Sequence, residues 1–190
     1  MNKTKKAIFD AAIEVFSHCG YDGATMDEIA NRAGVAKGTL YYHFKSKEEI
    51  FKFIINEGIN IINESVEDGI KDIKDPHKVV KTAAKLQLRY MNDNKDLFRV
   101  IISQVWGDSE RNKELREAVS KLINISNKSY HGIIDKGVVS EDDARFLGYS
   151  FIGILVSIAL YDLLNGEEYD NDEIIERFLK YNDVLHILNK

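Results

Sequence analysis

Residues 25–47 read TMDEIANRAGVAKGTLYYHFKSK, and this stretch decides the fold of the N-terminal part of the chain. It opens with a capping box, because the Thr25 hydroxyl can accept a hydrogen bond from the backbone N–H of Glu28 while the glutamate side chain reaches back. Gly34 stands where a left-handed turn is needed, so the first short helix ends just before it. A second short helix follows over about 36–44. A capped helix, a tight glycine turn and a second helix predict a helix-turn-helix.

The second of these helices carries groups that a purely structural helix does not need. Gly38 lowers helix stability by about 1 kcal/mol relative to alanine, but it also lets another backbone come close. Lysine, threonine, tyrosine and histidine side chains can donate to phosphates and to base edges. Neighbouring helical residues point about 100° apart, so Tyr41 and Tyr42 cannot both lie at the centre of one buried face, and at least one is expected to face outward. The polar and aromatic groups expected on the surface are Lys37, Thr39, Tyr41, Tyr42 and His43.

The charge distribution supports a polyanionic partner for the same stretch. The whole chain has a formal net charge of −5. Residues 1–55 nevertheless hold eight basic and seven acidic residues, and residues 29–47 hold four basic residues and no acidic one. A local basic stretch in an acidic protein marks a place where a nucleic acid can dock.

The same residues resemble the DNA-binding domain of the TetR family of transcription regulators. That domain typically shows Thr-x-x-x-Ile-Ala, then Ala-Gly-Val, then Gly-x-x-Tyr-x-x-Phe, then Lys-x-x-Leu. The matching residues here are Thr25, Ile29-Ala30, Ala33-Gly34-Val35, Gly38, Tyr41-Tyr42-His43-Phe44 and Lys47. Ile50 replaces the usual leucine, which is a conservative change, and the resemblance covers roughly residues 5–55. Because several spaced positions agree at once, it is far more specific than a single short motif.

The resemblance implies a role for most of the exposed residues. Those that would approach base edges in the major groove are Lys37, Gly38 and Tyr41. Those that would hold phosphates are Thr25, Tyr42, His43 and Lys47. Thr25 and Lys47 also stand at helix N-termini, whose free N–H groups suit anions. The complete set of candidate DNA-binding residues is Thr25, Lys37, Gly38, Thr39, Tyr41, Tyr42, His43 and Lys47.

Each of these residues also has a plainer interpretation. Tyr41 and Tyr42 could be core aromatics, His43 a structural histidine, and Lys45 and Lys47 solvated surface charges. Within the frame of a helix-turn-helix, the combination favours DNA binding. The residues expected in the core of this segment are Ile29, Leu40 and Phe44.

Apolar residues recur at helical spacing along nearly the whole chain, and the alternation typical of strands is absent. The sequence therefore predicts an all-α fold of about nine helices. A three-helix DNA-binding domain is expected over 1–47, and a helical ligand-binding and dimerisation domain over 48–190. The predicted helices cover about 3–18, 25–33, 36–44, 46–73, 76–91, 96–106, 110–136, 140–164 and 172–188. Gly20 is expected to stop the first of them.

The long fourth helix is shared between the two predicted domains. Ser46-Lys-Glu-Glu49 forms a second capping box at its start, and one apolar stripe runs from Phe51 to Ile73. Gly58 and Gly69 mark places where this helix can either bend or pack closely against a neighbour. A ligand that tilts the fourth helix would therefore carry the DNA-binding domain with it.

The C-terminal domain is rich in aromatic residues, and the resemblance implies a ligand cavity there. The cavity would be mostly apolar, although core packing is the simpler explanation for most of these side chains. The candidate ligand-binding residues are Ile62, Leu86, Tyr90, Phe98, Trp106, Tyr130, Tyr149 and Phe151.

Residues 146–161 carry no charge, yet they fall short of the roughly twenty residues that span a bilayer. A helix buried all round, in the core or an interface, is the better interpretation. The final helix has its own apolar stripe, so pairing both helices with their symmetry mates predicts a four-helix dimer interface. Such a homodimer would read a palindromic operator in double-stranded DNA.

Other chemistry finds little support in the sequence. Cys19 is the one cysteine, so no intramolecular disulfide forms, and a small buried residue is expected. His131 and Asp135 have helical spacing, but a surface ion pair is a better interpretation than a metal site. No phosphate-binding glycine loop and no nucleophile elbow is present. We therefore expect no enzyme activity, no cofactor and no metal. The polar first twenty residues lack a signal-peptide core, so a cytoplasmic protein without a membrane segment is expected.

The preferred interpretation is a ligand-responsive, homodimeric repressor released from its operator by a small, largely apolar ligand. One alternative is a constitutive DNA-binding protein without an effector. Another is a helical enzyme or binding module that has kept a helix-turn-helix.

Overall fold

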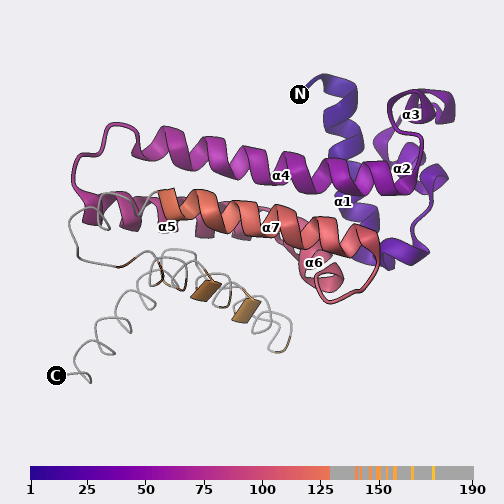
Figure 1. Ribbon diagram of the computed structural model, residues 1–190. Coiled ribbons are helices and arrows are strands. Elements are labelled where there is room, and N and C mark those ends of the chain that lie inside the picture. The colour runs from indigo at the N-terminus through magenta and orange to yellow at the C-terminus, as the bar shows by residue number, and fades with distance from the viewer. Residues whose placement is uncertain are drawn as a thin grey trace. The chain divides into compact units, whose positions relative to one another are not determined.

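The computed structural model describes residues 1–128 and ten further positions near the C-terminus. Those positions are 140, 142, 146, 149, 150, 153, 156, 157, 164 and 173. Over 1–128 the chain forms seven helices and no strand (Figure 1). They are α1 (Lys3–Gly23), α2 (Met26–Ala33), α3 (Lys37–His43), α4 (Lys47–Ile70), α5 (Pro76–Asp93), α6 (Lys95–Gln104) and α7 (Glu110–Lys128). None of the helices in this part of the chain is both long and apolar enough to cross a membrane.

The predicted all-α fold is confirmed, and the seven helices follow the predicted order. The end of the helix predicted over 110–136 lies outside the described residues. The helices predicted over 140–164 and 172–188 are described only at isolated positions. The count of nine helices therefore stays a prediction.

The first helix differs from the prediction at its C-terminal end. Gly20 breaks it as expected, with φ 68° and ψ 169°, but helical structure resumes for a short stretch and ends at Gly23. The Ala24 N–H then donates to the Gly20 carbonyl at 3.2 Å. As a result, Tyr21 sits between a kink and the start of α2.

Cys19, just before this kink, is exposed, so the prediction that it is buried is wrong. Its side chain lines a surface hollow between α1 and α2. The α2 side of this hollow consists of the polar residues Glu28, Asn31 and Arg32. Because no apolar face of α2 covers this part of α1, the thiol stays open to solvent.

The chain divides into two compact units. The first comprises residues 1–64 and 94–125, and residues 65–93 belong to the second. Both α4 and α7 begin in the first unit and continue as helices into the second. These units differ from the predicted domains 1–47 and 48–190, which stay a prediction about function.

The first unit has a well-formed apolar core. The large side chains buried most completely are Ile8, Ile29, Leu40, Ile50, Phe51, Ile54 and Leu97. Gly58 belongs to this packing, since a Cβ atom there would lie 2.5 Å from Leu97 Cδ2. In the second unit, Gly69 packs in the same way against Leu86. Because α4 is continuous through both glycines, close packing rather than bending explains them.

The start of α4 only half matches the predicted capping box. The Glu49 N–H donates to Ser46 Oγ at 3.2 Å, as expected. The Glu49 carboxylate, however, accepts from the Lys45 N–H at 2.7 Å instead of the Ser46 N–H. The helix ends at Ile70, so Ile73 lies beyond it.

Candidate nucleic-acid interface

The capping box predicted at Thr25 is present. The Glu28 N–H donates to Thr25 Oγ1 at 3.2 Å, and the Thr25 N–H donates to Glu28 Oε2 at 2.9 Å. The threonine hydroxyl also donates to Glu28 Oε2 at 2.8 Å. The helix N-terminus is therefore fixed by its own side chains before any DNA arrives.

Gly34 makes the turn of the helix-turn-helix. Its φ of 65° and ψ of 30° place it in the left-handed region, which glycine adopts without steric penalty. Ile29 and Ala30 on one side of the turn and Leu40 on the other are all buried. The turn therefore holds α2 and α3 against a shared core, as the sequence predicted.

Gly34→Ala is expected to lower the free energy of unfolding by about 1–2 kcal/mol, because an alanine side chain is strained at positive φ. No atom lies within 4 Å of the added Cβ, so backbone strain is the whole effect. Gly38→Ala is the matched control, since Gly38 is helical and also has open space around it. Urea unfolding measures both variants. A Gly34→Ala variant as stable as Gly38→Ala would contradict the strain argument.

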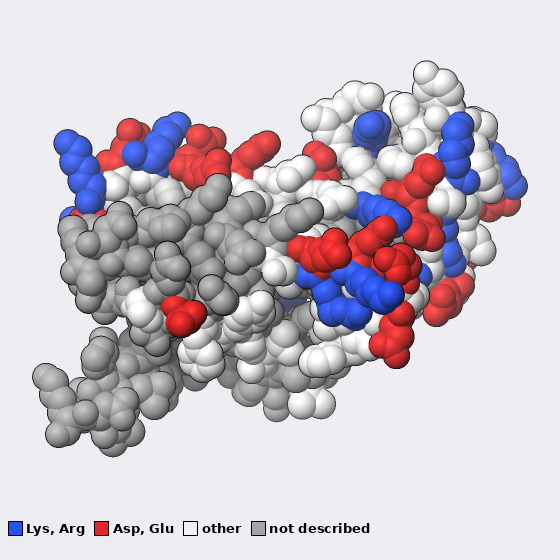
Figure 2. All heavy atoms as spheres, viewed as in Figure 1, with Lys and Arg blue, Asp and Glu red and all other residues white. Residues whose placement is uncertain are grey.

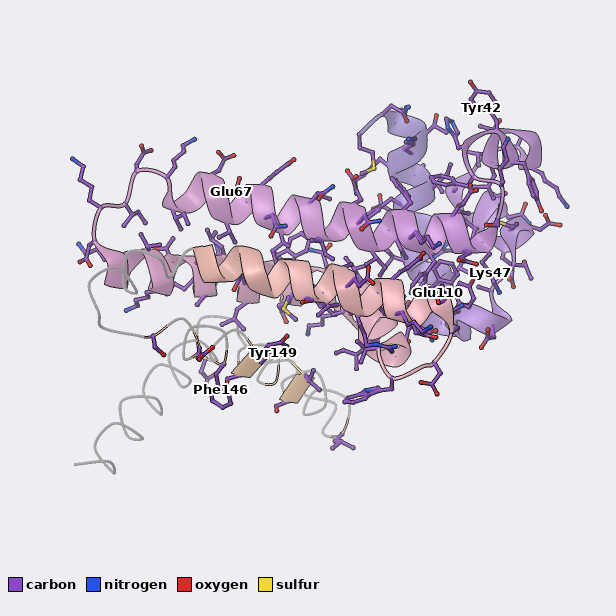
Figure 3. All side chains as sticks on the ribbon, viewed as in Figure 1. Tyr42, Lys47, Glu67, Glu110, Phe146 and Tyr149 are labelled. Atoms are coloured by element: carbon purple, nitrogen blue, oxygen red, sulfur yellow. The ribbon has the colours of Figure 1, made fainter. Side chains whose placement is uncertain are left out.

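The outer surface of α3 carries the predicted polar and aromatic groups. Tyr42 is 77% exposed and Tyr41 is 38% exposed, which confirms that at least one tyrosine faces outward. Tyr42 projects away from the surrounding helices (Figure 3). Leu40 and Phe44 are buried on the opposite side, as predicted. The other predicted contact residues, namely Lys37, Gly38 and Thr39, are exposed, and His43 is half-buried.

Several basic side chains of this segment have partners within the protein. Arg32 pairs with Glu14, and Lys37 pairs with Asp27. Lys45 Nζ donates to the carbonyl of Tyr41 at 3.0 Å. Figure 2 shows basic and acidic side chains interspersed on the face in view. The basic stretch seen in the sequence is therefore partly neutralised by acids from elsewhere in the chain.

Lys37, the first residue of the candidate recognition helix α3, is a clear example of this neutralisation. Its Nζ lies 2.7 Å from Asp27 Oδ1 and 2.8 Å from Oδ2. The hydrogen bond to Asp27 and the charge of that carboxylate raise the pKa of Lys37. To contact DNA, the ammonium must exchange this partner for a base or a phosphate.

Asp27→Asn is therefore expected to raise DNA affinity several-fold at low salt, because Lys37 is released and an acid is removed from the docking surface. Asp10→Asn is the matched control, since Asp10 pairs with Lys6 on α1 in the same way. Fluorescence anisotropy with duplex DNA at two salt concentrations measures both. Equal effects of the two substitutions would contradict a specific role for Asp27.

Lys47 makes contacts that its sequence position did not predict. Its Nζ donates to the carbonyls of Asp22 at 3.2 Å and Ala24 at 2.8 Å, and lies 4.6 Å from the centre of the Tyr21 ring. Lys47, labelled in Figure 3, thus ties the start of α4 to the segment before α2. Its contact with a phosphate stays a prediction.

Sequence reasoning also missed Tyr21. Burial raises the pKa of the Tyr21 phenol, and the nearby charge of Arg111 opposes that rise. No local motif marks either residue, because 90 positions separate them in the chain.

Tyr21→Phe is expected to keep more of its stability above about pH 10 than the wild type does. Because the pKa of Tyr21 is higher in the folded state than in the unfolded state, the protonated phenol stabilises the fold. This stabilisation is fully present below the unfolded-state pKa of 10.0, and it is lost as the pH rises through the folded-state pKa. Urea unfolding at about pH 8 and about pH 11 measures this loss. Tyr42→Phe serves as the exposed control. If the wild type and Tyr21→Phe lose stability in parallel, the interpretation is wrong.

The candidate ligand-binding residues fall in both units. In the first unit Ile62 is buried and Phe98 is half-buried, whereas Trp106 is 85% exposed. In the second unit Leu86 and Tyr90 are half-buried, and Tyr149 is exposed. Tyr130 and Phe151 lie outside the described residues. The exposure of Trp106 does not favour its place in an enclosed pocket, and the set as a whole stays a prediction.

Comparison with known proteins places the chain in a family. The family profile described as "Bacterial regulatory proteins, tetR family" matches residues 8–54. A solved structure of a candidate fatty acid metabolism regulator from Clostridium perfringens is 40% identical, with a TM-score of 0.83. The match covers 90% of this chain and 94% of that one. The chain belongs to the TetR family.

Further transcription regulators match over most of the chain. The HTH-type transcriptional activator FasR of Mycolicibacterium smegmatis is 27% identical over 173 residues, which cover 90% of this chain and 77% of FasR. The structure of FadR from Bacillus subtilis, solved in complex with stearoyl-CoA, shares the fold. It has a TM-score of 0.75 at 24% identity and covers 90% of this chain and 95% of that one. As a TetR-family member the chain is a DNA-binding transcription regulator and not an enzyme.

Proposed function

We propose that this TetR-family chain is a homodimeric repressor that leaves a palindromic operator when it binds a fatty acyl ligand. The observation that carries the proposal is the likeness over nine-tenths of the chain to the Clostridium perfringens regulator, whose description names fatty acid metabolism. The helix-turn-helix supplies the DNA-binding part of this activity, and the helical domain over residues 48–190 supplies the sensor.

The exposed side of α3 supports contacts with both base edges and phosphates. Lys37, Tyr41 and Tyr42 stand on one short helix whose other side is anchored by buried Leu40. Tyrosine and lysine donate to base edges and phosphates, and such contacts supply both orientation and sequence preference. Two copies related by twofold symmetry would read two equal half-sites.

The ligand class follows from the relatives and from the predicted pocket residues. The candidate set, with Ile62 and Leu86 among its members, is mostly apolar and suits an aliphatic chain. The Bacillus subtilis protein of the same fold was solved with stearoyl-CoA, which makes this thioester a suitable probe. FasR is named as an activator, so the sign of the response is part of the test.

The decisive experiment has two steps. Duplexes selected from a random library by the purified protein give the operator, and anisotropy then follows operator affinity while stearoyl-CoA is added. We expect affinity to fall with stearoyl-CoA and to stay constant with coenzyme A alone. A ligand shifts the equilibrium between two conformations only by binding one of them better. If stearoyl-CoA leaves operator affinity unchanged, the alternative of a constitutive DNA-binding protein is supported instead. A rise in affinity would contradict release by ligand.

The same samples test the dimer. Light scattering at micromolar concentration is expected to give twice the chain mass of 21.7 kDa. A stable monomer that still selects a palindromic duplex would contradict the dimer.

A further inference from the structure

Tyr21 occupies the joint between α1 and the helix-turn-helix. It follows the kink at Gly20 and precedes Thr25, the N-cap of α2, by four residues. Its ring stacks on Phe16 at a centroid distance of 5.6 Å and meets the edge of Phe51 at 5.3 Å. The position of this ring therefore fixes the short segment from which α2 begins.

Two cations hold the same ring. Lys47 Nζ lies 4.6 Å from its centre, and the Arg111 guanidinium carbon lies 3.3 Å from it. The Arg111 carbon is also 5.3 Å from the centre of the Phe51 ring. Arg111 Nε is buried and makes no hydrogen bond within the described residues, so contacts with aromatic faces fix this part of the side chain. Its Nη2 donates to Gln104 Oε1 at 2.7 Å and ties it to the end of α6.

These cations come from the first turns of two helices. Lys47 begins α4 and Arg111 is the second residue of α7, and both helices continue into the second unit. A displacement of either helix along its axis therefore reaches Tyr21 through a short, direct contact. The aromatic stack passes it on to the segment before α2.

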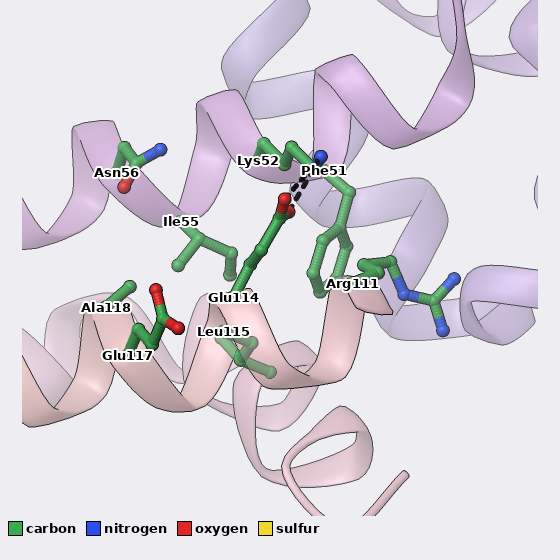
Figure 4. Close-up of a pocket in the computed structure, with 9 residues that line it drawn as sticks. All are labelled: Phe51, Lys52, Ile55, Asn56, Arg111, Glu114, Leu115, Glu117 and Ala118. Carbon is green, nitrogen blue, oxygen red and sulfur yellow. Dashed lines mark hydrogen bonds and ion pairs between the residues drawn. The ribbon is translucent and has the colours of Figure 1, made fainter. Parts of the chain in front are cut away.

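A hollow of about 270 Å³ separates α4 from α7 next to Arg111, with apolar walls formed by Phe51, Ile55, Leu115 and Ala118 (Figure 4). Lys52 bridges the hollow to Glu114 at 2.7 Å and also pairs with Glu48 at 3.0 Å. This ion pair links α4 to α7. Lys52 acts on the Tyr21 phenol through its charge, whereas the cations that contact the ring are Lys47 and Arg111, so Lys52 offers a comparison for the loss of charge alone.

We propose that Tyr21 is a positioning residue of the helix-turn-helix, and that Arg111 sets its place from the first turn of α7. Movement of α7 is thereby converted into a change in the orientation of α2 and α3. The inference deepens the proposed function and rests on it for the ligand response. It does not require any DNA contact by Tyr21 or Arg111 themselves.

The test compares Arg111→Met with Lys52→Met. Each substitution removes one positive charge and loosens α7 from its neighbours. Only Arg111→Met removes a cation that contacts the Tyr21 ring, and it also removes the hydrogen bond to Gln104. The ratio of operator affinity to affinity for an unrelated duplex is measured for both, with urea unfolding to confirm the folded state. We expect the ratio to fall on the order of tenfold in Arg111→Met and to stay unchanged in Lys52→Met. Tyr21→Phe keeps the ring and is expected to keep the ratio, whereas Tyr21→Leu is expected to lower it.

Stearoyl-CoA gives a second readout. Arg111→Met is expected to bind the thioester as tightly as the wild type while losing most of its effect on operator affinity. If stearoyl-CoA does not change the operator affinity of the wild type, the proposed effector is contradicted. The role of Tyr21 is then decided only by the ratio of operator affinity to affinity for the unrelated duplex. If Arg111→Met keeps the affinity ratio of the wild type, the positioning role is overturned. It is also overturned if Arg111→Met and Lys52→Met lower that ratio equally.

Discussion

Tyr41→Ala is expected to weaken operator binding about ten- to a hundredfold while leaving affinity for unrelated DNA nearly unchanged. A side chain that reads a base edge contributes about 1–3 kcal/mol of discrimination, and 1.4 kcal/mol is a factor of ten. Tyr41 is 38% exposed on α3 and lies under the Lys37 ammonium, 5.9 Å from its ring centre. The two side chains thus form one joint surface, which is predicted to face the major groove.

Tyr42→Ala is the matched control for this variant. Its side chain is 77% exposed and is predicted to contact phosphate, so affinity is expected to fall equally for all duplexes. Anisotropy with the operator and with a scrambled duplex separates the two patterns. Unchanged sequence preference in both Tyr41→Ala and Lys37→Ala would reject α3 as the recognition helix.

Phe51→Ala is expected to lower the free energy of unfolding by about 3–5 kcal/mol, a large part of the stability of a typical domain. Phe51 is 1% exposed and touches the rings of Phe16 and Tyr21. It also lines the hollow between α4 and α7, so removal of the ring enlarges a space that neighbouring side chains do not fill.

Phe53→Ala provides the comparison, since it makes the same change two positions along α4. Phe53 is only half-buried, although it contacts Phe9 and Phe44. A loss of about half the Phe51 value or less is expected in urea unfolding, because less apolar surface returns to water. Equal losses would show that the core is not centred on Phe51.

The helix-turn-helix could be predicted from the sequence because its determinants are local. The Thr25–Glu28 capping box and the Gly34 turn depend on residues at most four positions apart, and burial of Leu40 follows from helical periodicity. The exposure of the α3 tyrosines follows from the same geometry.

The contacts around Tyr21 could not be predicted in this way. Arg111 is 90 residues away from Tyr21, and the carbonyl that Lys47 binds at Asp22 is 25 residues away. Periodicity reports which face of a helix is apolar, but not which distant helix covers it. The exposure of Cys19 has the same cause, because it depends on the polar side of α2 that lies opposite.

The exposed Cys19 thiol can be labelled with a spin probe, which allows distance measurements. It is the single cysteine of the sequence, and its thiol is exposed beside α2. In the proposed homodimer, a nitroxide attached there would place one spin on each subunit, without any engineered substitution. Pulsed electron spin resonance would then give the distance between the two DNA-binding domains directly. A change in this distance on addition of stearoyl-CoA would measure the rearrangement that accompanies release from the operator.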